Sequence, residues 1–517
     1  MAKLVTIGDS ISQGFMSAAA ARSDLSYSAI LAGILGLRRG DNYHFPHWPL
    51  GGMPLNFETL LRYLQKFYGD NIWGPFEWPS AIAHRIPSFL DKIEDYYERG
   101  AGDYRMPYRD PFADGGNAVP GFHNLAAFGF TVSDAWQVTP AVCLKELEPN
   151  GTRVVDDEWF ATPSDAFYRN AFRLLNPNNE RGKDDFSQLG WLEHYAQNDA
   201  DGVENLILWL GSNNALGTVL HMELHRTLVD LDEYKEMDHF ARGKFNLWTR
   251  EVFEQDYRHL IDETARILGE QVHTAKQPNW RVFLGTVPAV TVAPLAKGVG
   301  KPESRQDPFG VVRPSVRYYE NYTYVPFDGD DAGRGRVPHL SIDEAYEIDQ
   351  NIAEFNEVIR AEAARLNADL GDERFIVVDI NGALLRLAHK RNNGRPTYPL
   401  PAELIRNGKP RVNTKFYDAK NDRVRGGGVF SLDGVHPSAV GHGLLAREML
   451  AAMQGKSPQE VDADLDWDMI IARDDLLNRP VNLIQELYQH NTLLRLILRA
   501  MRSTDESIDD FEEDPRR

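Results

Sequence analysis

Short apolar runs recur along the chain, and each one ends at glycine, proline or small polar residues. Runs of about four to eight apolar residues are typical of strands that are buried on both faces of a parallel sheet. The runs lie at residues 4–7, 206–210, 280–287 and 374–379, with a shorter one at 123–129.

The segments between these runs have apolar residues at helical spacing. The capping box Ser341-Ile-Asp-Glu344 marks the start of the longest segment. Strands that alternate with helices in this way predict an α/β fold, a three-layer α/β/α (flavodoxin-like) parallel sheet of about five strands. We expect the helices at residues 25–36, 88–98, 257–268, 341–366 and 439–453.

Long insertions interrupt this alternation within a predicted domain of residues 1–453. They lie at about 41–117, 138–200 and 293–338. The first is rich in aromatic residues and could line an apolar pocket, act as a lid, or form a small separate core. The last is rich in glycine, proline, arginine and aspartate and is too long for an ordinary connection, so we interpret it as an insertion or a mobile flap.

Residues 454–517 form a predicted C-terminal extension, in which a linker leads to a helix and an acidic tail. We expect the apolar stripe of this helix to pack on the body or on a partner chain, which allows self-association, rather than on a membrane. The acidic segment 505–517 is expected to be disordered. The stripe consists of Leu483, Leu487, Leu494, Ile497, Leu498 and Met501.

Charge and composition narrow the range of partners. The chain has 517 residues and a formal net charge of −20, so binding to nucleic acid is not expected. No long uncharged apolar run predicts a transmembrane segment, and no signal peptide precedes the first strand, so we expect a cytoplasmic location. The single cysteine, Cys143, is expected in the core, since one cysteine supports neither an internal disulfide nor a thiolate zinc site.

Candidate chemistry begins at the end of the first apolar run, where Gly8, Asp9 and Ser10 follow at once. A serine at such a strand-to-helix corner lies at the carboxyl end of a strand, where ligands of open α/β sheets bind. Near the far end of the chain, Asp433 and His436 are three residues apart in a turn with glycine and proline, so the carboxylate can orient the imidazole. His442 falls on the following helix and is expected to pack or cap.

Two further strand-to-helix corners, at Gly129 and at Asn213, supply polar groups for an acyl-transfer reaction. Ser10 would attack a carbonyl carbon, His436 would act as general base, and Asp433 would hold the imidazole. We expect the oxyanion to be bound by the backbone N–H groups of Ser10 and Gly129 and by the side-chain amide of Asn213. No acidic pattern nearby calls for a metal, and we expect no cofactor. Taken singly, each motif could equally be a helix cap, a loop or a surface ion pair.

These motifs resemble the four sequence blocks of the SGNH, or GDSL-type, hydrolases, and they occur in the order found in that family. By this resemblance Ser10, Gly129, Asn213 and His436 correspond to the family's name-giving residues, with Asp433 completing the triad. The chain departs from the family pattern at Ile11, where leucine is usual, and at Asn214, where aspartate is usual. The blocks are Gly8-Asp9-Ser10-Ile11, Asn124 with Gly129, Gly211-Ser212-Asn213-Asn214, and Asp433-Gly-Val-His436-Pro.

The resemblance implies a serine hydrolase, an esterase or lipase, that acts on a small-molecule or lipid ester and leaves the substrate itself open. An acyltransferase that uses the same site is an alternative, because the aromatic insertion could exclude water. A non-catalytic binding or scaffold protein on the same fold is a third hypothesis.

Overall fold

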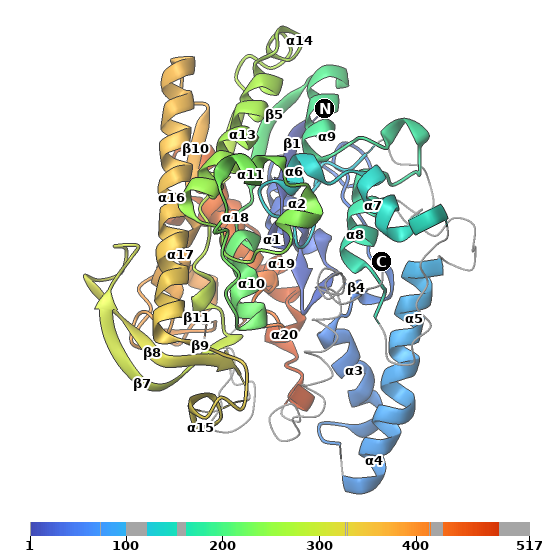
Figure 1. Cartoon of the computed structure of the whole chain (residues 1–517), viewed down its shortest axis with the longest axis vertical. Coiled ribbons are helices and arrows are strands. Elements are labelled where there is room, and N and C mark those ends of the chain that lie inside the picture. Colours follow the sequence, from blue (N-terminus) through green and yellow to red (C-terminus); the bar gives the residue numbers. More distant parts are fainter. Residues whose placement is uncertain are drawn as a thin grey trace.

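The computed structural model describes residues 2–72, 74–99, 121–151, 162–325, 327, 329–412, 414 and 428–484. Its centre is a four-stranded sheet in which every neighbouring pair is parallel, in the order β1-β5-β6-β10 (Figure 1). The mixed α/β class with a parallel sheet is therefore confirmed. The strands are β1 (Ala2–Gly8), β5 (Val203–Trp209), β6 (Arg281–Gly285) and β10 (Phe375–Val378).

The predicted strand at 123–129 is present only as an isolated parallel bridge beside β1. The backbone N–H of Thr6 donates to the carbonyl oxygen of His123 at 2.8 Å, and that of Leu125 donates to the carbonyl of Thr6 at 2.9 Å. The segment then turns at Gly129, which leaves too short a length for a regular ladder. About five strands were predicted, and this sheet has four.

Helices pack on both faces of the sheet because its strands are buried on both sides. Along β1, Val5 and Ile7 join one apolar core, whereas Leu4 joins another. The capping box predicted at Ser341 and Glu344 is present at the start of the longest helix. The first core contains α9 (Gln188–Asn198), α13 (Arg250–Gly269) and α16 (Ile342–Leu370), and the second contains α2 (Tyr27–Ile34) and α18 (Ala439–Gln454).

The described parts of the first two insertions are largely helical. The first projects at the lower right of Figure 1. Short strands near the N-terminus, β2 (Phe15–Met16) and β3 (Ala19–Ala20), pair with β4 (Met53–Pro54) and join the first insertion to the sheet's first corner. The helices are α3 (Phe57–Tyr68), α4 (Gly74–Ser80) and α5 (Ile86–Arg99) in the first insertion, and α7 (Pro140–Leu147) and α8 (Ala166–Leu175) in the second.

The third insertion differs from the predicted flap, because it contains most of a three-stranded antiparallel sheet. Its strands β7 (Ala296–Gln306) and β8 (Ser315–Tyr324) pair with β9 (His339–Ser341), next to α16 (Figure 1). A buried network fixes it, since the Tyr318 hydroxyl donates to Asp349 of α16 at 2.6 Å, and Asp349 also pairs with Arg391. These partners are distant in sequence, so local composition did not reveal them.

The predicted linker after residue 453 is wrong. The chain instead forms a 3₁₀ segment (Pro458–Asp464), α19 (Trp467–Ala472) and α20 (Asp475–Asn478), and Trp467 joins the second core. Of the predicted C-terminal helix, the structure describes only the beginning, where Leu483 is buried. The rest of its apolar stripe and the acidic tail lie outside the described residues, so self-association stays a prediction.

Two packing predictions are confirmed. Cys143 is a buried free thiol, and His442 is fully buried, with its Nδ1 accepting a hydrogen bond from the Tyr27 N–H at 3.3 Å. Among the helices in the described ranges, none combines the length and apolar character needed to cross a bilayer.

Candidate active site

Ser10 begins a short helix directly beyond the first strand. The Asp9 side chain caps this helix, α1 (Ser10–Gln13), by accepting the Ile11 N–H at 3.0 Å. Glycine is required at position 8, because a Cβ there would lie 2.9 Å from the carbonyl oxygen of Trp209 on β5. Ser10 therefore lies at the carboxyl edge of the sheet, held there by the close approach of β1 to β5 and by the Asp9 cap.

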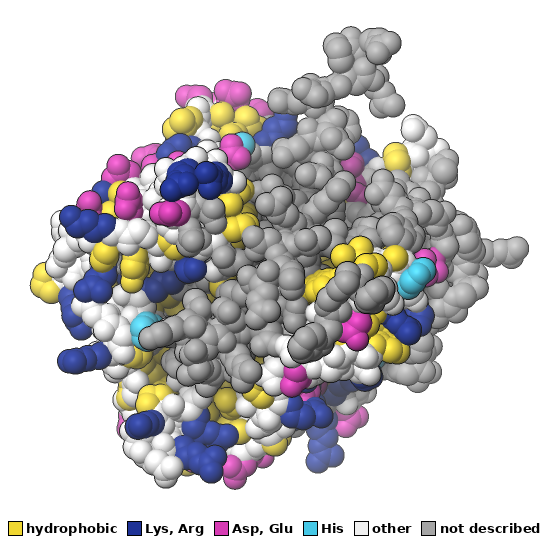
Figure 2. Space-filling model, turned by 90° about the horizontal axis from the view of Figure 1, so that it is seen from below, with side chains coloured by type: hydrophobic (Ala, Val, Ile, Leu, Met, Phe, Trp, Pro, Cys, Tyr) yellow, Lys and Arg dark blue, Asp and Glu magenta, His cyan; other side chains and the backbone are white. Residues whose placement is uncertain are grey.

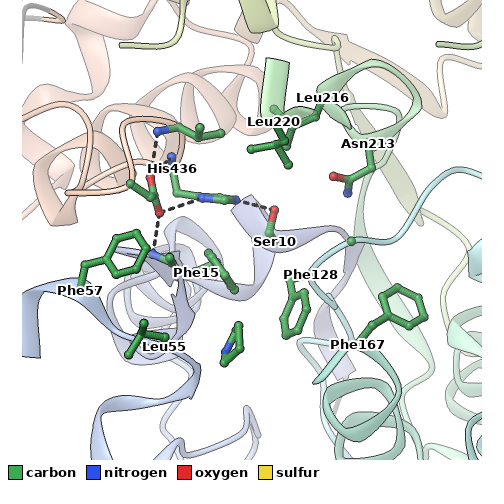
Figure 3. A pocket seen from close by; sticks show the side chains of 15 residues that line it. Ser10, Phe15, Leu55, Phe57, Phe128, Phe167, Asn213, Leu216, Leu220 and His436 are labelled. Atoms are coloured by element: carbon green, nitrogen blue, oxygen red, sulfur yellow. Dashed lines mark hydrogen bonds and ion pairs between the residues drawn. The ribbon is translucent and has the colours of Figure 1, made fainter. Parts of the chain in front are cut away.

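The structure brings Ser10, His436 and Asp433 together, although 426 residues separate the first two (Figure 3). His436 Nε2 lies 2.8 Å from the Ser10 hydroxyl, and His436 Nδ1 lies 3.0 Å from Asp433 Oδ2. A carboxylate only accepts hydrogen bonds, so Nδ1 carries the proton and Nε2 can accept the proton of Ser10. The imidazole is therefore in the tautomer that a general base needs.

Asp433 is held as a carboxylate. Its Oδ1 accepts the backbone N–H groups of Val435 and His436, both at 2.8 Å. Burial alone would raise the pKa of Asp433, but the charge of His436 and these hydrogen bonds outweigh burial and hold the pKa below its ordinary value.

A tight turn that the sequence analysis missed also holds Asp433. Ser17 and Ala18 connect β2 to β3 with φ of +53° and +66°, a conformation that favours glycine or asparagine. The Ala18 N–H donates to Asp433 Oδ2 at 2.8 Å, and the Ser17 N–H donates to the Ser431 hydroxyl at 2.8 Å. Backbone strain here is retained beside the site, as often occurs at functional positions. Neither residue type signals such a turn.

The two predicted oxyanion positions outside Ser10 face the same cavity as Ser10. Gly129 has φ of +81°, and a Cβ there would lie 2.8 Å from the ring of Phe167, so glycine is required. Among the described residues, no acceptor is found for its N–H. Asn213 begins α10 (Asn213–His221), and its Nδ2 donates to the Phe130 carbonyl at 2.8 Å, which leaves the second amide hydrogen available.

Asn214, the position that departs from the family pattern, still supports this loop. Its Oδ1 accepts the N–H of Val132 at 3.1 Å, while its Nδ2 is buried without a partner in the part of the chain described. Asparagine therefore keeps the accepting role that an aspartate would have here.

Buried amide side chains connect the corners, and sequence reasoning missed these as well. Gln13 Oε1 accepts the Phe128 N–H at 2.9 Å, next to Gly129. Gln188 Nε2 donates to the carbonyls of Gly8 (3.0 Å) and Leu125 (2.7 Å). Since each amide joins segments that are far apart in sequence, no local pattern indicates its role.

The Asp9 carboxyl group, next to Ser10 in the sequence, has hydrogen-bond partners for only one of its two oxygens among the described residues. It is almost completely buried, and Oδ2 has no hydrogen-bond partner among the described residues. Burial raises the pKa of Asp9 to about 6. Ser212, the Ile11 N–H and the charge of His436 lower this pKa, but their combined effect is smaller than that of burial.

An apolar cavity of about 150 Å³ opens directly at Ser10 and His436. Figure 3 shows phenylalanine and leucine side chains from several segments around the serine. Leu55 and Phe57 come from the first insertion, whereas Tyr63 packs against Phe67 and Phe89 away from the cavity. One part of the insertion thus lines the site and another part forms a separate cluster. The other apolar residues of the wall include Phe15, Phe128, Phe167, Leu216, Leu220 and Val435.

Across the described ranges, no three histidine, cysteine, aspartate or glutamate side chains are grouped so as to hold a metal ion. The arrangement offers a nucleophile, a base and hydrogen-bond donors at one end of an apolar cavity. Comparisons of the chain with models of protein families, with curated proteins and with solved structures found no match.

Proposed function

We propose that this protein is a serine hydrolase of the SGNH type that cleaves carboxylic esters. One observation carries the proposal: Ser10, His436 and Asp433 form a continuous hydrogen-bonded series, at 2.8 Å and 3.0 Å, at the mouth of an apolar cavity. A structural serine or a surface ion pair would not require this order of partners.

The reaction would proceed through an acyl-enzyme. Ser10 Oγ attacks the ester carbonyl carbon while its proton moves to His436 Nε2. The C–O bond to the alcohol then breaks, and His436 returns the proton to the leaving oxygen. A water molecule, deprotonated by His436, attacks the acyl-enzyme, and the free acid leaves as Ser10 regains its proton.

Negative charge on the carbonyl oxygen would be bound by the N–H groups of Ser10 and Gly129 and by Asn213 Nδ2. The Gly129 N–H, which has no acceptor among the described residues, and the second amide hydrogen of Asn213 support this role. Such donors stabilise the transition state more than the ground state when they are held in advance. The hydrogen bonds from Phe128 to Gln13 and from Val132 to Asn214 hold the Gly129 loop in this way.

The apolar cavity fits the acyl half of the substrate. An engineered protein cavity of about 150 Å³ lined by apolar side chains holds one benzene-sized molecule, which is roughly six carbon atoms. The cavity beside Ser10 has a volume of about 150 Å³. We therefore propose short acyl groups, of about four to six carbons, rather than long fatty acyl chains.

The finer fold assignment is part of this proposal. A flavodoxin-like three-layer sheet of five strands is supported by the helices on both faces and by residues 123–127 bonded along the outer edge of β1. On the face seen in Figure 2, lysine and arginine side chains lie among acidic ones over the described part.

The test is hydrolysis of p-nitrophenyl butanoate by the wild-type chain and by Ser10→Ala. We expect the substitution to lower kcat/KM by at least about 10⁴-fold, because no other group can form the acyl-enzyme. Ser12→Ala is the matched control, since Ser12 lies two residues away in the same helix and bonds Tyr27 instead. Equal activity of wild type and Ser10→Ala would exclude the proposed mechanism.

A further inference from the structure

A second cavity, of about 290 Å³, adjoins the first at the oxyanion residues. Gly129, Phe167 and Asn213 line both cavities. Phe167 comes from α8, and its ring contacts Gly129, so it stands where the two cavities meet. The carbonyl carbon of an ester carries the carbon chain of the acid on one side and the alkoxy oxygen on the other. Two cavities that meet at the oxyanion donors therefore match the two halves of an ester.

The second cavity has more polar side chains in its lining than the first, and their charges are largely balanced. Among its lining groups, His239 Nδ1 lies 2.7 Å from Asp134, and Arg242 is paired with the buried Asp256 at 2.9 Å. Lys244 also lines it, and no described carboxylate lies within ion-pair distance of this side chain. Glu223 is the other carboxylate of the described lining, and its Oε1 lies 3.3 Å from His225 Nε2.

Balanced charge argues against both an anion and an apolar ligand. A phosphate or carboxylate would require an excess of unpaired cationic groups, and among the described lysine and arginine side chains of the lining Lys244 alone has no carboxylate partner. An apolar group would remove water from many polar atoms without replacing their hydrogen bonds. A neutral ligand with several hydroxyl groups satisfies these atoms, because each hydroxyl can both donate and accept.

One hydrogen-bonded series in this cavity ends at the Tyr168 hydroxyl. Asp134 Oδ2 accepts the Thr131 N–H at 2.7 Å, and Oδ1 accepts His239 Nδ1. His239 Nε2 then faces the Tyr168 hydroxyl at 3.2 Å. Burial opposes the charged form of His239, but Asp134 outweighs burial and raises the pKa of His239 above its ordinary value. In either protonation state of His239, the Tyr168 hydroxyl keeps one hydrogen-bonding group for a ligand: its proton when Nε2 is protonated, and its oxygen when Nε2 is not.

The volume sets the size of the ligand. At about 290 Å³ the cavity is about twice as large as the apolar one. By the same comparison with a benzene-filled cavity, it holds roughly twelve non-hydrogen atoms, which is the size of one hexose. The rings of Phe167 and Phe245 line it and offer faces for the C–H groups of a sugar ring.

We propose that the second cavity is the subsite for the alcohol half of the substrate, and that this alcohol is a neutral polyol of monosaccharide size. The Tyr168 hydroxyl is then a hydrogen-bond partner of the polyol. The inference rests on the proposed function, since it assigns the leaving group of that same reaction. Together the cavities specify an ester of a short acyl group with a sugar-like alcohol.

The experiment compares esters that share one acyl group. The substrates are the butanoyl esters of glucose at O6, of glycerol, of octanol and of p-nitrophenol. We expect kcat/KM for the glucose ester to exceed that for the octyl ester by at least about tenfold, with the glycerol ester between them, because the octyl chain leaves the polar atoms unpaired. Inhibition of p-nitrophenyl butanoate cleavage by glucose should be competitive, and glucose 6-phosphate should bind no more tightly than glucose.

Tyr168→Phe tests the assigned hydrogen-bond partner. We expect the ratio of kcat/KM for the glucose ester to kcat/KM for the p-nitrophenyl ester to fall about tenfold, mainly through KM, since one hydrogen bond to the ligand is lost. Tyr257→Phe is the matched control, because Tyr257 is buried in α13 and its hydroxyl has no partner among the described residues. Its ratio should equal that of the wild type.

The outcomes separate the two proposals. Cleavage of the p-nitrophenyl ester with the octyl ester preferred over the glucose ester would overturn the polyol subsite and leave the serine hydrolase intact. Stronger inhibition by glucose 6-phosphate than by glucose would overturn it in favour of an anionic alcohol. Failure to cleave any of the four esters would instead contradict the proposed function.

Discussion

The reacting groups and the walls of the apolar cavity are held by different forces. The Asp433 carboxylate accepts hydrogen bonds from three backbone N–H groups, and the Gly129 loop is fixed by buried amide side chains. By contrast, Leu55 and Phe57 reach the cavity from an insertion and line it with apolar side chains, and the Phe57 N–H donates to the Ser17 carbonyl at 2.8 Å. We therefore expect changes among the hydrogen-bonded groups to alter the rate with every ester, and changes in the wall to alter which ester is preferred.

The largest effect after loss of the nucleophile is expected at Asp433. Asp433→Asn would present an amide where Nδ1 of His436 needs an acceptor, and it favours the wrong imidazole tautomer. We expect kcat to fall about 10⁴-fold with butanoyl and acetyl esters alike. Steady-state kinetics with both esters, together with circular dichroism to verify the fold, measure this. A fall in kcat with only one of the two esters would contradict the expectation that hydrogen-bonded groups such as Asp433 affect the rate with every ester.

Asn213→Ala removes one oxyanion donor and is expected to lower kcat about 10²–10³-fold with little change in KM. Asn198→Ala is a suitable control, because Asn198 lies at the exposed end of α9 and bonds its own helix. If KM instead rose about 10²–10³-fold and kcat were unchanged, Asn213 would bind the ground state and would not stabilise the oxyanion.

Phe57→Ala tests the wall. Removal of the ring enlarges the cavity, so the ratio of kcat/KM for octanoyl to butanoyl p-nitrophenyl esters should rise about tenfold. Phe67→Ala in the same helix is the matched control, since that ring is 48% exposed and packs on Tyr63. An unchanged ratio would exclude Phe57 as the limit on acyl length.

The smallest effect on rate is expected at Asp9. Its pKa of about 6 in the folded protein exceeds the ordinary value of 3.8, so the buried charge destabilises the fold above pH 6, and this penalty is absent below about pH 4. Asp9→Asn should therefore stabilise the protein at pH 8 by roughly 3 kcal/mol and give no gain near pH 4. The same change should lower kcat only several-fold, through loss of a negative charge near His436.

Thermal unfolding of the Asp9→Asn variant and the wild type at both pH values measures the stability difference. An equal shift in Tm at pH 8 and pH 4 would show that the charge of Asp9 is not the cause. A rise in stability at pH 8 with lower activity would indicate that this charge is retained for function at the expense of stability.

The parts of the site that lie at strand ends could be predicted from sequence. Apolar runs locate β1 and β5, and the polar residues that follow them, Ser10 and Asn213, have side-chain chemistry that suits one reaction. The fold class was predictable for the same reason, because a strand buried on both faces has a distinct pattern.

The remainder depends on partners that are distant in sequence. The turn at Ser17 and Ala18 adopts a left-handed conformation because it bonds Ser431 and Asp433, and neither residue type favours that conformation by itself. The β7–β8 sheet likewise depends on the pairing of Asp349 with Arg391. The second cavity is made by segments around residues 131, 168, 223 and 239, which only tertiary packing brings together.

Labelling with a fluorophosphonate tests the central claim most directly, because the reagent phosphonylates only a serine that an adjacent base activates. We predict one modification per chain, located by peptide mass spectrometry at Ser10 and absent from Ser10→Ala. An unlabelled wild-type chain, or a label that persists in Ser10→Ala, would contradict it.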